Sequence, residues 1–210
     1  MKITEDLQKD IIKLYVKDRL SMKQIGDKFN LSSSAIRYYL DKYKIKRRTI
    51  SDAITSIYIT RFKKKPFKLK EGLSKAEMEL KIAGIMLYWG EGAKSGGTVK
   101  FANSDPEMIK VFLKFLRNIC GIFEERLKVL IHMYPDQDEK TLIKFWSFVT
   151  KIKKENFYKS YTHEGKKGTY KNKSLYGTLA VHYSDKKLLN LILNWLDFYK
   201  TKFIIHNKPS

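Results

Sequence analysis

Cysteine is nearly absent from this sequence: Cys120 is the only one among 210 residues. A single thiol excludes an intramolecular disulfide and a cysteine-based zinc site. Long apolar runs are absent too, and the first ten residues, MKITEDLQKD, carry acids where a signal peptide requires apolar side chains. These absences predict a protein of the reducing cytoplasm that does not enter a membrane.

Acidic residues are also in short supply. The chain has 43 Lys and Arg against 22 Asp and Glu, a formal net charge of +21, and both its N-terminal and its C-terminal part are basic. A hydrophobic content of 43% supports a packed core, so the excess charge belongs to a folded protein. A charge of this size predicts a polyanionic partner, either nucleic acid or an anionic membrane surface. With DNA as the partner, we expect association with the nucleoid.

The N-terminal region shows the spacing of three short helices. Apolar residues recur at helical spacing over residues 5–18, Ser21 is placed to open a second helix, and Ser32 or Ser33 is placed to cap a third after a turn at Asn30. The stretch SMKQIGDKFNLSSSAIRYYL resembles the helix-turn-helix of transcription regulators and recombinases. A generic three-helix core is the alternative.

In a helix-turn-helix the second helix enters the major groove, so its exposed residues are candidates to read base edges. They lie opposite the apolar Ile36 and Leu40 on the helical wheel. They are Ser33, Ser34, Arg37 and Tyr38. A basic cluster follows where phosphates are expected. It comprises Lys42, Lys44, Lys46, Arg47 and Arg48.

The chain is expected to contain two domains joined by a basic segment. Residues 50–62 predict one more helix, and RFKKKPFKLKEGLS, with one proline and one glycine, predicts a linker. We therefore expect a helix-turn-helix domain (1–60), a linker (61–75) and a second domain (76–205). The linker is either solvated or follows a DNA backbone.

The second domain contains an internal repeat. Residues 97–116 and 177–196 share Gly, Thr, Ser, Asp and two Leu at an offset of 80 residues. Each copy predicts a strand followed by an amphipathic helix. With a further strand at 156–161, the pattern predicts an α+β domain with a mixed or antiparallel sheet, helices on one face and a pseudo-two-fold. Asp105 and Asp185 start the two helices, so we interpret them as helix caps.

An acid stands between two glycines in LYWGEGAK. A helix is predicted over residues 75–91, and it ends at this acid, Glu91. Gly92 suits a left-handed C-terminal cap. An anion at the carbonyl end of a helix is disfavoured by about 0.3–1 kcal/mol, so we expect a nearby cation, either the Lys94 side chain or a bound divalent metal.

The stretch GIMLYWGEG (84–92), followed by a turn, a strand and NSD opening a helix, resembles the LAGLIDADG homing-endonuclease family, loosely over residues 76–198. In that family the motif helices of two halves or two protomers pack at a two-fold axis, and the acid before the last glycine ligates a catalytic divalent metal. The resemblance implies that Glu91 is a metal ligand, with Mg²⁺ as the expected ion. It makes Glu91 and Lys94 the candidate catalytic residues.

The chain departs from the family motif at Met86, where a small residue is usual, and at Trp89, where an acid is common. It also supplies one acid, because the repeat counterpart of Glu91 is Lys171. A cleaving protein is therefore expected to be a homodimer, joined through the helix that ends at Gly90–Glu91. The resemblance implies a LAGLIDADG-like α/β sandwich with an internal pseudo-repeat.

The resemblance also places strands of the sheet in the major groove, which has room for a two-stranded ribbon. The loop at 162–177 is basic and carries two tyrosines, so it is either a further DNA contact or a solvated hairpin loop. The candidate DNA-binding lysines of this domain are Lys100, Lys128, Lys166, Lys167, Lys171 and Lys173.

These features predict a sequence-specific double-stranded DNA-binding protein that cuts DNA as a LAGLIDADG-type homodimer. The alternative is a non-catalytic helix-turn-helix transcription regulator in which Glu91 is a remnant. A membrane-surface protein is a competing class, but the basic helices lack a strongly apolar opposite face. RNA binding has no supporting module motif. Four histidines lack metal-ligand spacing and are interpreted as strand or tail residues. They are His132, His163, His182 and His206.

Overall fold

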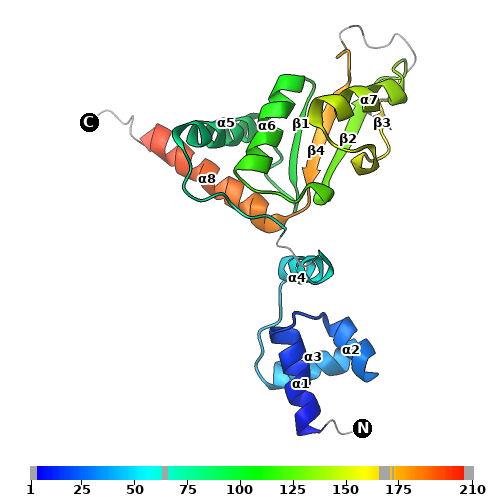
Figure 1. The fold of residues 1–210 in the computed structure, drawn as a ribbon, viewed down its shortest axis with the longest axis vertical. Coiled ribbons are helices and arrows are strands. Elements are labelled where there is room, and N and C mark those ends of the chain that lie inside the picture. Colours follow the sequence, from blue (N-terminus) through cyan, green and yellow to red (C-terminus); the bar gives the residue numbers. More distant parts are fainter. Residues whose placement is uncertain (1–3, 63–65, 166–170, 172, 206–210) are drawn as a thin grey trace. The chain divides into compact units, whose positions relative to one another are not determined.

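The computed structural model describes residues 4–62, 66–165, 171 and 173–205 (Figure 1). They divide into two units, Met1–Pro66 and Phe67–Ser210. The division falls inside the interval 61–75 that the sequence predicts as a linker. The later part of this interval belongs to the second unit, because the Lys68 N–H donates to the Gly121 carbonyl at 3.0 Å.

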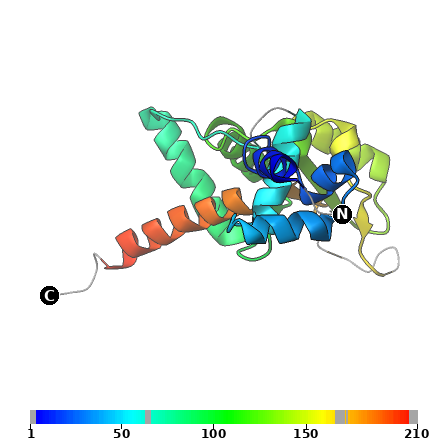
Figure 2. The ribbon, with the colours of Figure 1, turned by 90° about the horizontal axis from the view of Figure 1, so that it is seen from below.

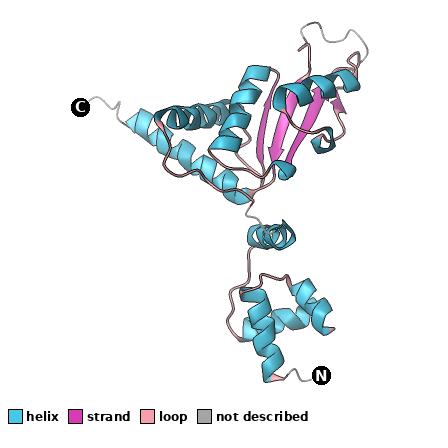
Figure 3. Ribbon diagram, in the orientation of Figure 1, coloured by secondary structure: helices cyan, strands magenta, loops and turns pink. Residues whose placement is uncertain are grey.

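Eight α-helices, two 3-10 helices and four strands lie in the described residues (Figures 1 and 3). The helices of the first unit are α1 (Glu5–Val16), α2 (Met22–Phe29), α3 (Ser33–Lys42) and α4 (Ile50–Phe62). Those of the second are α5 (Lys75–Glu91), α6 (Pro106–Asn118), η1 (Glu124–Arg126), α7 (Glu139–Thr150), η2 (Lys154–Asn156) and α8 (Lys186–Ile205). The strands are β1 (Val99–Asn103), β2 (Leu127–Met133), β3 (Tyr161–Thr162) and β4 (Thr178–Tyr183). The protein is therefore α+β, as the sequence predicts.

Local side chains fix where α2 and α3 begin. The Ser21 hydroxyl accepts from the Gln24 N–H at 3.1 Å, and the Gln24 side chain accepts from the Ser21 N–H at 2.8 Å, which forms a capping box. The Ser32 hydroxyl accepts from the Ala35 N–H at 3.1 Å, so Ser32 caps α3. The buried core beneath these helices consists of Ile11, Tyr15, Ile25, Ile36 and Leu40.

The turn between α2 and α3 is tight. Asn30 ends α2 in the left-handed conformation with a φ of 52°, which asparagine adopts more readily than most residues. A Cβ at Gly26 would lie 2.4 Å from the carbonyl oxygen of Leu31, so the chain can return this closely only past a glycine. The turn orients α3 so that Ile36 and Leu40 face the core.

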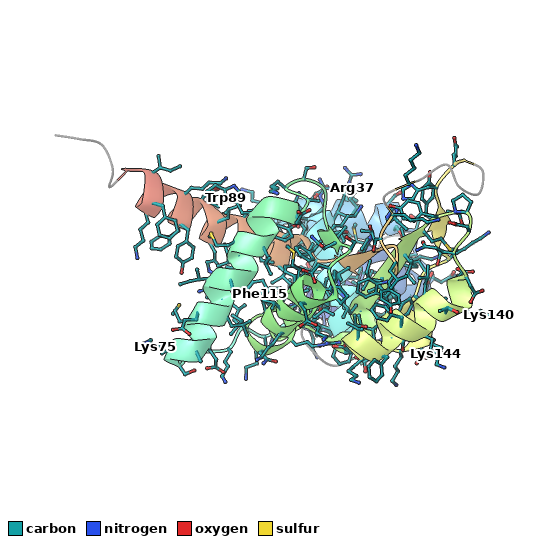
Figure 4. The ribbon with its side chains drawn as sticks, turned by 90° about the horizontal axis from the view of Figure 1, so that it is seen from above. Arg37, Lys75, Trp89, Phe115, Lys140 and Lys144 are labelled. Carbon is teal, nitrogen blue, oxygen red and sulfur yellow. The ribbon has the colours of Figure 1, made fainter. Side chains whose placement is uncertain are left out.

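A four-stranded mixed sheet in the order β1-β4-β2-β3 forms the centre of the second unit. β4 is antiparallel to both of its neighbours, and β2 pairs with β3 in parallel. Odd-numbered side chains such as Phe101, Val129 and Val181 are buried, whereas most even-numbered ones stay accessible. α6 and α7 pack on the buried face (Figure 4).

The sheet pairs the strands of the two repeat copies directly. The β1–β4 register places Phe101 opposite Val181, its counterpart 80 residues later, and Val99 opposite Tyr183. An antiparallel pair centred on equivalent residues is the arrangement that a two-fold axis perpendicular to the sheet produces. Helices follow both strands, α6 after β1 and α8 after β4, so each copy is one strand and one helix.

α5 packs against α6 and α8. Gly84 permits the first contact, because a Cβ there would lie 2.2 Å from Cγ of Phe115 (Figure 4). In the second contact the Lys81 ammonium lies 4.1 Å from the ring centroid of Trp195. α8 crosses α5, and its C-terminal turns extend beyond that helix (Figure 2).

Two local predictions are wrong. Residues 154–156 form η2, and the strand expected at 156–161 is reduced to an isolated parallel bridge between Phe157 and Val129 and to β3, which begins at Tyr161 and lasts two residues. Gly92 is extended, with φ −83° and ψ 146°, and not left-handed. Glycine is required there for another reason: a Cβ would lie 2.3 Å from the ring of Tyr88. Among the described helices, none is long and apolar enough to span a membrane.

Candidate nucleic-acid interface

The polar side of α3 carries the four residues that the sequence assigns to base reading. They are Ser33, Ser34, Arg37 and Tyr38. All four are exposed, and Tyr38 keeps 61% of its surface accessible. On the opposite side Ile36 and Leu40 are fully buried. The helix is thus anchored by its apolar side while its polar side stays available to a ligand.

Basic side chains continue from α3 into the segment before α4. Three of them are exposed lysines, namely Lys42, Lys44 and Lys46. Arg47 is exposed as well, and its Nε lies 3.1 Å from Oδ1 of Asp41. All four cations are exposed, and their contact with phosphates stays a prediction.

Arg48 differs from these four cations because it is half-buried and contacts other residues of the first unit. Its guanidinium lies 4.0 Å from the ring centroid of Tyr15 and donates to the backbone carbonyls of Tyr15 and Leu20. Its backbone N–H donates to the Tyr15 hydroxyl at 2.9 Å. Arg48 therefore holds the segment before α4 against α1 and the loop that follows α1.

Replacing Arg48 with alanine is expected to destabilise the first unit by about 1–3 kcal/mol, because charge-assisted hydrogen bonds and a cation–π contact are lost together. The measurement is amide hydrogen exchange in the full-length chain, where α1 to α3 should exchange roughly 10–100 times faster. Arg48→Lys should rescue little, since an ammonium lacks the planar fork that reaches two carbonyls. Unchanged exchange combined with weaker DNA binding would instead restore Arg48 as a phosphate contact.

The register of the sheet arranges the side chains of its second face in rows that cross the strands; most of them are partly accessible, whereas Ala180 is buried. Each row takes one residue from each of three neighbouring strands. The rows are Lys100–His182–Lys128, Ala102–Ala180–Leu130 and Thr178–His132–Tyr161. The middle row, which consists of small and apolar side chains, therefore lies between a basic row and a row that ends in histidine and tyrosine.

Sequence reasoning missed the ring cluster on this face, because strand pairing brings together histidines that are distant in the sequence. The His132 ring centroid lies 5.5 Å from that of Tyr161 and 5.9 Å from that of His163. Burial, and then His163, lower the pKa of His132. Burial, then Lys100 and His132, lower the pKa of His182. Both imidazoles are therefore mostly neutral at pH 7, able to donate and accept hydrogen bonds.

The candidate lysines of the second unit differ in their surroundings. Lys100 and Lys171 are exposed. The Lys128 ammonium donates to Oδ1 of Asn156 at 2.6 Å, and Lys173 forms an ion pair with Asp136. Lys166, Lys167 and His206 lie outside the described residues. Lys100 is therefore the most accessible cation among the three rows.

α5 ends at Glu91, as the sequence predicts, and its end is joined to β1. The Ala93 N–H donates to the Lys100 carbonyl at 3.0 Å, and the Tyr88 hydroxyl donates to the Ala93 carbonyl. Burial raises the pKa of Tyr88 to about 12, so this hydroxyl keeps its proton and remains a donor. These contacts hold Glu91 beside β1, at the edge of the sheet, where its side chain is exposed.

Lys94 compensates the negative end of the α5 dipole, but it does not pair with the Glu91 carboxylate. Its ammonium donates to the Trp89 carbonyl at 2.6 Å, at the negative end of the α5 dipole. Within the part of the chain that is described, Glu91 forms no ion pair, and no group of three or more His, Cys, Asp or Glu is placed to hold a metal. A single exposed carboxylate nevertheless fits Mg²⁺, which usually takes one or two carboxylates and completes its shell with water and substrate phosphates.

Glu91 borders an open groove of about 590 Å³ between α5 and α6. A Cβ at Gly90 would meet nothing within 4 Å, so packing inside the chain does not require a glycine there. The groove is largely apolar apart from its two acids. Its lining residues are Ala83, Met86, Leu87, Gly90, Glu91, Glu107, Met108 and Val111.

Asp105 and Asp185 are helix caps, which confirms their interpretation from sequence. Oδ1 of Asp105 accepts from the Glu107 N–H at 2.8 Å. Oδ1 of Asp185 accepts from the N–H groups of Lys187 and Leu188, each at 3.0 Å. Their carboxylates are therefore occupied at the starts of α6 and α8.

Both units present accessible basic side chains next to groups that hydrogen-bond or stack. In the first unit these lie on α3 and the segment after it, and in the second they lie on the face of the sheet that carries Lys100, His182 and Lys128. No protein-family model, curated protein or solved structure matches this chain. The inference of function therefore depends on the residues and their geometry.

Proposed function

We propose that the protein binds double-stranded DNA sequence-specifically through α3 and through the open face of the sheet. The observation that carries this proposal is the geometry from α2 to α3. A capped helix follows a tight turn past Gly26 and exposes Arg37 and Tyr38, and a run of exposed cations comes next. This is the order of parts in a helix-turn-helix, where the second helix reads bases and flanking cations hold phosphates.

On this proposal α3 lies in the major groove. Arg37, one turn into the helix, is placed to make the bidentate contact to guanine that arginine forms most often. Ser33 and Ser34 flank it toward the start of α3, where recognition helices usually contact bases. Lys42 and Lys44 lie at the other end and contact phosphates, so they set affinity for any sequence.

The sheet supplies the second DNA surface. Lys100 and Lys128 flank His182 in one row, and the adjacent row carries the short side chains of Ala102 and Ala180 beside Leu130. Tyr161, half exposed at the β3 edge, adds a hydroxyl and a ring. The resemblance to LAGLIDADG proteins, whose sheets lie in the major groove, supports the same assignment.

The α5 groove supports a homodimer as the working form. Ala83 and Gly90, together with Met86 and Leu87, form a stripe one to two turns apart on the side of α5 that faces the groove. Small residues that internal packing does not require permit a second backbone to approach closely. The occupant on this proposal is α5 of a second copy, which brings two Glu91 carboxylates to one two-fold axis.

Metal-dependent cleavage is a second candidate function, favoured by Glu91, which is held at the sheet edge without a cation partner in the described chain. In a dimer, one Glu91 from each protomer would hold Mg²⁺. The ion would supply charge stabilisation at the attacking and leaving oxygens of phosphodiester hydrolysis. A regulator that binds DNA without cutting it, with Glu91 as a remnant, is the alternative.

Titration of the full-length protein with duplex DNA and with anionic vesicles tests the proposed partner. We expect duplex affinity to fall steeply between about 50 and 200 mM salt, because Lys and Arg contacts release counterions from phosphates. Sedimentation of the same sample should give a dimer. Vesicle binding equal to or stronger than duplex binding would exclude DNA as the preferred partner.

Acidification from about pH 8 to pH 6 is expected to strengthen DNA binding by the sheet. The pKa values of His132 and His182 are lowered in the free protein, and a bound phosphate raises them. Binding therefore takes up protons, and affinity increases as the pH falls, by up to about tenfold for each unit of pKa change at one histidine.

The control for this pH effect is His182→Gln, which should remove part of the pH dependence and leave affinity at pH 8 nearly unchanged. The same lowered pKa values destabilise the second unit in acid, because its unfolded histidines bind protons first below pH of about 6.5. Circular dichroism at each pH ensures that only folded protein is compared. Affinity that is independent of pH would exclude the histidines from the interface.

A further inference from the structure

Asp41 lies between two arginines on the exposed side of the first unit. Its Oδ2 lies 3.8 Å from Nε of Arg37, one turn earlier in α3, and its Oδ1 lies 3.1 Å from Nε of Arg47, in the segment after α3. The side chains of Asp41, Arg37 and Arg47 are 51%, 58% and 44% exposed. Each carboxylate oxygen therefore serves one guanidinium, and all three groups remain open to a ligand.

An acid at this position is unfavourable on two counts. Asp41 is in the last turn of α3, where the helix dipole disfavours a negative charge. It also stands within a basic surface that, on the proposed function, approaches phosphates, so it repels the ligand. Exposed ion pairs contribute little to stability, so folding gives no sufficient reason for the residue.

We propose that Asp41 is a specificity-determining residue, which positions Arg37 along α3 and restrains Arg37 and Arg47 from binding phosphates of any sequence. This inference rests on the proposed function, because α3 must read DNA for it to hold. An arginine paired with Asp41 gains little by exchanging a carboxylate for a phosphate. It gains more at a guanine, where two directed hydrogen bonds form and the ion pair keeps the guanidinium aimed at the base edge.

The test compares Asp41→Asn with the wild-type full-length protein on two duplexes of equal length. One carries the site enriched from a randomised library, and the other is a scrambled version of it. We expect the variant to bind the scrambled duplex about three- to tenfold more tightly, and the enriched site less than about twofold more tightly. The ratio of the two affinities therefore falls. Asp41→Glu, which keeps the charge, should retain most of the ratio.

Asp27→Asn is the matched control. Asp27 is exposed on α2 of the same unit, and within the described chain it forms no ion pair. Its loss removes the same charge, so both duplexes should bind more tightly by one common factor. If Asp41→Asn behaves like this control, Asp41 acts only through net charge and the inference is wrong. If the wild-type protein itself fails to distinguish the two duplexes, the proposed function fails first.

Discussion

Glu91→Gln is expected to abolish Mg²⁺-dependent cutting of the enriched DNA site while leaving its affinity unchanged or slightly higher. Glutamine keeps the shape of the side chain but removes the charge that a magnesium ligand needs. Affinity does not fall, because one negative charge near the phosphates is lost. Gel analysis of end-labelled duplex measures cutting, and anisotropy with Ca²⁺ in place of Mg²⁺ measures binding.

Glu107→Gln is the matched control for this prediction, since Glu107 lines the same groove from α6 and carries the same charge. Its variant should cut like the wild type, because the resemblance assigns the metal to Glu91 alone. Equal loss of cutting in both variants would contradict the assignment of the metal to Glu91 alone. A wild-type protein that never cuts its enriched site with Mg²⁺ or Mn²⁺ would leave the regulator as the function.

Arg37→Ala is expected to weaken binding to the enriched site by about 1–3 kcal/mol, roughly 10- to 100-fold, if the guanidinium reads a base edge. Binding to scrambled DNA should change much less, so specificity at one base position is relaxed. Competition titrations with single-base variants of the site locate that position.

Lys42→Ala provides the contrast to Arg37. Lys42 is exposed near the end of α3, where it is assigned to phosphates, so its loss should weaken all duplexes by a common factor and reduce the salt dependence. An Arg37 variant that binds the enriched site as tightly as the wild type would reject α3 as the base-reading helix.

The ends of helices that are marked by capping residues could be predicted from the sequence to within a residue or two. α5 has a serine at its N-cap, and Ser74 forms a capping box with Glu77 while Gly92 follows its last residue. Short-range patterns of this kind do not depend on the rest of the fold. β3 is two residues long and exists only through its pairing with β2, so its position could not be derived from residues 156–161.

The candidate site likewise contains residues that local sequence patterns predict and residues that only long-range pairing brings together. The exposed side of α3 follows from helical periodicity, and the structure agrees with it. Its place after Lys46 and Arg47 in a basic run predicts a phosphate contact for Arg48, but its hydrogen-bond partners Tyr15 and Leu20 lie about 30 residues earlier. The ring cluster around His132 likewise depends on strand register. Long-range pairing determines both, and one sequence contains no direct signal for it.

Enrichment from a randomised duplex library by the full-length protein, at about 0.15 M salt, tests the central claim most directly. We expect one sequence motif to emerge and to bind more tightly than scrambled DNA by at least about 10³-fold, the low end of the range for specific proteins. Failure of any motif to emerge, with all duplexes bound alike, would contradict sequence-specific recognition of double-stranded DNA by this protein.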